Sequence, residues 1–223
     1  MGQGAEPASC RAEALSMNES LHTLLDDPRL WRAGRHQPHW PVLASGHPEL
    51  DALLPGGGWP ARLTEVAVAH WGSGELALFM PLLQRLSRDE AAGWFAWIAP
   101  PYLPYAPAFA AAGVDLSRML LVHARDDTET LWATEQALQS GSCRVVLSWV
   151  GRADGRALRR LQLAAEHRQT PVILFRPPAA LAAPSPAALR LSLDSGPEGP
   201  CLHLRKHRGG AARSLPVTAL HGR

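Results

Sequence analysis

The chain almost lacks lysine: of its 22 basic residues, only Lys206 is a lysine. Cysteine is also sparse, and Cys10, Cys143 and Cys201 lie too far apart for a metal finger or a disulfide framework. No apolar run reaches the roughly 18 residues that span a bilayer, and the first residues lack the basic start and apolar stretch of a signal peptide. We therefore expect a cytoplasmic protein with no membrane segment and no metal site.

Charge is distributed unevenly along the 223 residues, of which 46% are hydrophobic, enough to bury a sizeable core. Residues 1–143 contain nine basic and 16 acidic side chains, whereas residues 144–223 contain 13 basic and four acidic ones. This asymmetry indicates either a polyanionic or acidic partner for the C-terminal part, or a basic surface that is merely solvated.

From Ser45 onward, short apolar runs alternate with segments of helical periodicity. Several runs are continuously apolar, which is typical of parallel strands covered on both faces. The alternation predicts an α/β fold with a doubly wound, mostly parallel sheet. The predicted strands are 62–68, 94–98, 119–123, 144–150 and 171–175, and the predicted helices are 75–87, 104–112, 128–139 and 155–168.

The two ends of the chain differ from this core. Residues 1–44 contain one helical stretch but too little apolar surface to fold alone, so we interpret them as an N-terminal arm. Residues 45–196 form the predicted core, which includes an Ala/Pro loop at 176–188. Residues 197–223 form a basic strand and tail, and their first part completes a hairpin around two Gly-Pro pairs.

The segment after the first predicted strand has the spacing of a phosphate-binding loop without its chemistry. Such a loop has two glycines five residues apart, then a lysine that neutralises phosphate and a hydroxyl that holds Mg²⁺. Ala69 occupies the first glycine position, whereas Glu75 and Leu76 occupy the lysine and hydroxyl positions. A carboxylate about 4 Å from a phosphate is repelled by about 4 kcal/mol at an effective dielectric of about 20. The degenerate loop comprises Ala69, Gly72, Ser73, Gly74, Glu75 and Leu76.

Two further positions lack the acidic residues of a nucleotide hydrolase. Pro101, after the second predicted strand, replaces the glutamate that would activate water. Ser148, near the end of the fourth predicted strand, replaces the aspartate that would hold Mg²⁺. We therefore expect a pseudo-ATPase without a catalytic residue or a bound cofactor.

The stretch SGHPELDALLPGGGWP at 45–60, followed by RLTE at 62–65, resembles the sequence that leads into the phosphate loop of RecA-family proteins. The resemblance continues through 112–116 and 187–194 and covers about two-thirds of the chain. Within that superfamily, GSGELAL at 72–78 and the basic segment ending at 208–210 are most similar to the ImuA family of translesion-synthesis accessory proteins. These proteins have been grouped with SulA-type division inhibitors, which share the fold without its phosphate loop.

The resemblance implies a RecA-like fold and a non-catalytic adaptor in the SOS-induced DNA-damage response. Its implied partners are an ImuB-like protein, an error-prone replicative-type DNA polymerase, RecA and single-stranded DNA. Two alternatives stay open. The first is a SulA-like cell-division inhibitor that caps a polymerising partner. The second is a residual DNA-dependent ATPase that receives an arginine from another protein.

Arginines gather on one side of the predicted helix 155–168, opposite an apolar stripe of Leu158, Leu161 and Ala165. In the RecA fold this helix follows the strand whose loop approaches single-stranded DNA. The arginines, together with the basic C-terminal strand, either contact phosphates or an acidic partner surface, or form a solvated face. The candidate contact residues are Arg152, Arg156, Arg159, Arg160, Arg168, Arg205, Lys206 and Arg208.

Two further predictions concern apolar side chains: a contact surface on the arm, and tryptophans that are buried in the core. Leu21, Leu24, Leu25 and Trp31 form a possible anchor for RecA, for an ImuB-like protein or for self-association. The strand patterns predict that Trp94, Trp97 and Trp149 are buried in the core.

Overall fold

The computed structural model describes residues 40–89, 93–196, 199–207 and 213–217. The chain divides into two units, residues 1–36 and residues 37–223. The first unit, with the predicted anchor Leu21, Leu24, Leu25 and Trp31, lies outside the described residues. The second unit begins before the predicted core boundary at residue 45, because strand β1 (Val42–Leu43) pairs with β2 (Trp59–Pro60).

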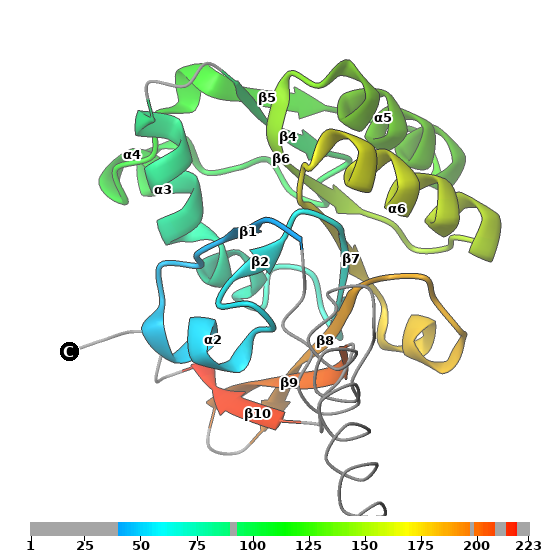
Figure 1. The fold of residues 1–223 in the computed structure, drawn as a ribbon. Helices are drawn as coiled ribbons and strands as arrows, with labels where there is room; N and C mark the ends of the chain where they lie inside the picture. The colour runs from blue at the N-terminus through cyan, green and yellow to red at the C-terminus, as the bar shows by residue number, and fades with distance from the viewer. Residues whose placement is uncertain (1–39, 90–92, 197–198, 208–212, 218–223) are drawn as a thin grey trace, which may run out of the picture. The chain divides into compact units, whose positions relative to one another are not determined.

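In the described part of the chain, one sheet of eight strands has the order β10-β9-β8-β3-β7-β6-β4-β5 (Figure 1). The five pairings from β8 to β5 are parallel, and β9 runs antiparallel to both β8 and β10. The prediction of an α/β fold with a mostly parallel sheet is therefore confirmed. The strands are β3 (Leu63–Val68), β4 (Trp94–Ile98), β5 (Met119–Val122), β6 (Cys143–Trp149), β7 (Val172–Arg176), β8 (Leu189–Gly196), β9 (Gly199–His207) and β10 (Arg213–Pro216).

The predicted C-terminal hairpin is present: β8 and β9 pair from Leu189 opposite His207 to Gly196 opposite Gly199. Strand β9 belongs to the main sheet, so the segment predicted as a basic strand and tail begins inside the folded unit. Strand β10, which was not predicted, pairs with β9 and extends the sheet by one strand.

Helices cover both faces of the sheet, and α5 and α6 lie side by side on one of them (Figure 1). In α6 the predicted stripe of Leu158, Leu161 and Ala165 is buried against that face, as expected for an amphipathic helix. The helices are α2 (Pro48–Leu53), α3 (Met80–Arg88), α4 (Ala106–Ala111), α5 (Asp127–Ser140) and α6 (Gly155–Arg168), with 3₁₀ turns η1 (Glu75–Leu78), η2 (Leu116–Arg118) and η3 (Pro178–Ala182).

The larger core cluster lies on the opposite face, between the sheet and α3. Phe79 stacks on Trp59 with ring centroids 4.5 Å apart and meets Phe175 edge-on at 5.6 Å. Trp97 and Trp149 are buried there as predicted, but Trp94 is 46% exposed, so its predicted core position is wrong. Trp94 begins β4 beside the edge strand β5, where the sheet ends and leaves its ring open to solvent.

A buried charge cluster joins three adjacent strands. Glu65 on β3 accepts a hydrogen bond from Arg176 on β7 at 2.6 Å and forms an ion pair with Arg190 on β8 at 2.9 Å. Arg190 also donates to the carbonyl oxygens of Ala180 and Ala183, at 2.7 and 3.0 Å. It thereby ties η3, within the predicted Ala/Pro loop, to the sheet.

Candidate functional site

The segment predicted to be a degenerate phosphate loop follows β3 and contains two glycines in the left-handed backbone region. Gly72 and Gly74 have φ angles of 84° and 99°, which side chains other than glycine rarely adopt. The predicted α-helix does not begin at Glu75: the 3₁₀ turn η1 comes first, and α3 begins only at Met80. The α-helical N-terminus that supplies amide donors and a positive dipole end in a phosphate loop is therefore displaced from this loop.

The carboxylate of Glu75 lies inside the loop. Glu75 is only 2% exposed, and its Oε1 accepts a hydrogen bond from the backbone N–H of Gly72 at 2.9 Å. In a working phosphate loop, backbone N–H groups bind the anion. Here the carboxylate of Glu75 accepts one backbone N–H of the predicted loop and places a negative charge within it.

The two positions that lack acidic residues have different surroundings. Pro101 lies beside the loop and lines a pocket with Glu75 and Trp149. Ser148 is fully buried, and its Oγ lies 2.8 Å from Oγ1 of Thr134 on α5. Because successive strand residues face opposite sides of a sheet, Trp149 rather than Ser148 is the β6 residue that faces the loop.

We expect Ser148→Ala to lower the free energy of unfolding by about 1 kcal/mol, because it removes the buried hydrogen bond between the two hydroxyls, although Thr134 still donates to the carbonyl oxygen of Thr130. Urea unfolding of Ser148→Ala, Thr134→Val and the double variant measures the coupling between the two hydroxyls. Strictly additive effects would contradict a direct contact and would place the Ser148 side chain elsewhere.

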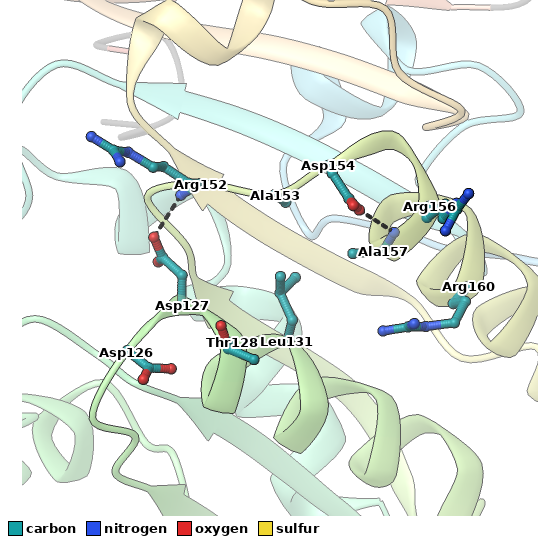
Figure 2. A pocket seen from close by; sticks show the side chains of 10 residues that line it. All are labelled: Asp126, Asp127, Thr128, Leu131, Arg152, Ala153, Asp154, Arg156, Ala157 and Arg160. Carbon is teal, nitrogen blue, oxygen red and sulfur yellow. Dashed lines mark hydrogen bonds between the residues drawn. The ribbon is translucent and has the colours of Figure 1, made fainter.

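A second pocket, of about 880 Å³, lies where the N-termini of α5 and α6 meet (Figure 2). Arg152, Arg156 and Arg160 line it, and Arg152 extends to the opposite side of the pocket from the other two (Figure 2). All three are exposed, and Arg160 forms an ion pair with Glu135 at 3.1 Å. Arg152 and Arg156 have no ion-pair partner among the residues that the structure describes.

Three aspartates line the same pocket, and each accepts hydrogen bonds from backbone amides. Asp127 accepts from the N–H groups of Gly151 and Arg152, both at 2.8 Å (Figure 2 shows the second). Asp126 and Asp154 cap α5 and α6, with bonds of 2.8 and 2.7 Å. The positive dipole ends of α5 and α6 offset part of the negative charge of these carboxylates.

Next to this pocket, Arg125 is already paired. The backbone N–H of Arg125 donates to the Glu129 carboxylate at 2.8 Å, and this bond lowers the pKa of Glu129. The side-chain hydrogen bond to the same carboxylate raises the pKa of Arg125. Arg125 therefore adds little free positive charge to the pocket.

The remaining predicted contact residues do not join this pocket. Arg159 is exposed elsewhere on α6, and Arg168 lies beside Gly141 at the far end of α5. Arg205 is on β9, across the sheet, where it donates to Asp194 and to Ser192 at 3.0 and 2.9 Å. Lys206 is also on β9, and Arg208 lies outside the described residues. The predicted contact residues thus form several separate groups.

Sequence reasoning missed the aspartates of the arginine pocket and the aromatic residues beside Glu75. Two of the aspartates could have been predicted as N-caps, because Asp126 and Asp154 stand immediately before helices. The segment PPYLPY at 100–105 could also have been recognised from the sequence, since it contains both tyrosines of the chain.

The helices that the structure describes are all too short or too polar to span a membrane.

Comparison with known proteins places the chain in a family. A family model described as cell division inhibitor SulA matches residues 66–171. Protein ImuA of Caulobacter vibrioides is 33% identical over 57% of this chain and 54% of the relative, so the match spans about half the length of that relative. Cell division inhibitor SulA of Pseudomonas aeruginosa is 30% identical over 52% of this chain and 73% of the relative.

A crystal structure of SulA from Pseudomonas aeruginosa is 29% identical to this chain. Its superposition covers 51% of this chain and 96% of that one, with a TM-score of 0.43. On the sequence match to SulA of Pseudomonas aeruginosa, this chain belongs to the SulA family, and it is also similar to ImuA.

Proposed function

We propose that this protein is a non-catalytic accessory protein of damage-tolerant DNA synthesis. It would link an ImuB-like protein and an error-prone replicative-type polymerase to RecA and single-stranded DNA, on a RecA-like arrangement of the sheet. The relationship to ImuA supports this function, because translesion synthesis is the role that the family resemblance implies.

The observation that carries the proposal is the Glu75 carboxylate inside the phosphate loop. Phosphoryl transfer depends on positive groups that stabilise the charge of the transferred phosphate. The loop instead contains a buried negative group bonded to Gly72, and η1 separates it from α3. A chain with this loop is suited to present surfaces to partners rather than to hydrolyse ATP.

The arginine pocket supports the proposed contact with DNA. Arg152 and Arg156 lie on opposite sides of the pocket and have no acidic partner among the described residues (Figure 2). A strand that crosses the pocket would meet the two guanidinium groups in succession, and guanidinium groups bind phosphate oxygens well. The excess of basic over acidic residues in the C-terminal part of the chain would strengthen the attraction for phosphate.

The experiment is fluorescence-anisotropy binding of the full chain to a labelled single-stranded oligonucleotide over a salt series, with and without MgATP. We expect binding that weakens steeply with salt and does not change with MgATP. Arg152→Gln with Arg156→Gln should reduce the slope of log K against log salt by roughly 1.4, because each phosphate contact on a single strand contributes about 0.7.

The matched control is Arg159→Gln with Arg168→Gln. This double variant removes the same charge from exposed arginines of α6 that do not line the pocket. An equal change of slope in both double variants would refute the pocket as the contact site. Stronger binding with MgATP would support the residual ATPase. No binding at any salt concentration, together with filamentous cells on overexpression, would support the division inhibitor.

A further inference from the structure

Beside the degenerate loop lies a pocket of about 220 Å³ that neither the proposed DNA contact nor the fold explains. Its walls come from four separate parts of the chain: the loop after β3, the end of β4 with the segment 100–105, helix α4 and the end of β6. Most of the lining is aromatic or proline, and Glu75 is its only charged residue. The pocket therefore combines an apolar wall with one negative group.

Three buried side chains of this wall have a polar atom without a hydrogen-bond partner. They are Oε2 of Glu75 and the indole Nε1 atoms of Trp97 and Trp149, and the residues are 2%, 1% and 6% exposed. Almost all buried polar groups in folded proteins are paired, because an unpaired one costs about 1–3 kcal/mol. The unpaired carboxylate oxygen, on a residue that lines this pocket, favours a ligand that brings hydrogen-bond donors.

The rim of the pocket is exposed and apolar. Tyr102, Leu103 and Tyr105 are 66%, 74% and 71% exposed, although side chains of this size are usually at least half covered. Tyrosine is enriched among the residues that dominate protein–protein binding. Prolines 100, 101 and 104 restrict the backbone of the segment, which lowers the entropy lost when a partner binds.

We propose that this pocket receives an arginine side chain from a partner protein. The guanidinium group donates to Oε2 of Glu75 and stacks on the tyrosine rings, which arginine does better than lysine because its head group is planar. A phosphate or a DNA strand fits poorly, since the lining contains no arginine, lysine or histidine to balance its charge.

Tyr102 lies beside the loop that contains Glu75. The Tyr102 ring lies over Gly72, so that a Cβ atom at Gly72 would be only 3.3 Å from Cε2 of the ring. Because Tyr102 is largely exposed, rotation of its side chain uncovers the carboxylate without disturbing the core. The partner's arginine then occupies the position that the Tyr102 ring leaves, between this ring and Tyr105.

The test uses the full chain with ¹⁵N-labelled tryptophan and two blocked peptides, acetyl-Leu-Arg-Leu-amide and acetyl-Leu-citrulline-Leu-amide. Citrulline keeps the shape of arginine but has no charge. We expect the arginine peptide to shift the indole N–H signals of Trp97 and Trp149, with a dissociation constant about tenfold lower than that of the citrulline peptide. The two signals are assigned with Trp97→Phe and Trp149→Phe.

Glu75→Gln should remove the preference for arginine, whereas Glu49→Gln, which removes an exposed carboxylate on α2, should not. If Glu75→Gln does not fold, Tyr105→Ala provides a second variant, because the side chain is exposed and its loss should weaken peptide binding without unfolding the protein. Equal affinity for the two peptides, or no shift of either signal up to about 10 mM peptide, would overturn the proposal. The result does not depend on whether the chain binds DNA.

Discussion

Glu65→Gln should lower the free energy of unfolding by about 3–5 kcal/mol, one of the two largest losses that we expect from a single substitution. Glu65 is 1% exposed and lies between Arg176 and Arg190, which are 6% and 7% exposed. Glutamine retains the volume of glutamate but leaves two buried positive charges without a counter-charge. With a urea dependence of about 2 kcal/mol per M, the midpoint of unfolding should fall by about 2 M.

Arg176→Met is the control for this effect. It should be milder than Glu65→Gln, because Glu65 keeps its ion pair with Arg190 and the methionine side chain fills most of the space. Arg190→Met should be more harmful than Arg176→Met, since it also releases the carbonyl oxygens of η3. If Glu65→Gln has the same urea midpoint of unfolding as the wild type, the Glu65 charge does not stabilise the two buried arginines.

Phe79→Ala should lower the free energy of unfolding by about 3–5 kcal/mol, since it removes a fully buried ring and leaves a cavity. The ring stacks on Trp59 of β2 and meets Phe175 of β7, so it joins the β1–β2 ribbon to the main sheet. Phe79 also lies between η1 and α3, at the point where the helix finally begins. Chemical denaturation monitored by tryptophan fluorescence measures the loss.

Phe79→Leu should cost less than about 1.5 kcal/mol, because leucine retains most of the buried volume. Leu163→Ala, at a position on α6 that is 47% exposed, should change stability by only about 0.5 kcal/mol. Equal losses for Phe79→Ala and Phe79→Leu would mean that the aromatic contacts, rather than the volume of the side chain, hold this part of the core.

Local sequence patterns predicted most of the regular elements. β4 and α6 have the predicted bounds, because a continuous apolar run and an amphipathic stripe are signals within one segment. Helix α2 was missed, and so were β1, β2 and β10, which are short strands that acquire their hydrogen bonds from distant parts of the chain. The start of α3 was also wrong, since Gly74 in the left-handed region opens a 3₁₀ turn instead.

The amino-acid sequence by itself determined that the phosphate loop contains a glutamate, that the sheet is mostly parallel and that positive charge gathers toward the C-terminus. The tertiary structure alone decided which side chains meet. Ser148 lies in a mostly apolar strand whose two faces look alike in the sequence, and only strand pairing turns it toward α5. In the same way, the predicted arginines separate into distinct groups, whereas Glu75, Trp97, Tyr102 and Trp149, from distant segments, line one pocket. Such contacts depend on how the strands are ordered in the sheet, which no local pattern records.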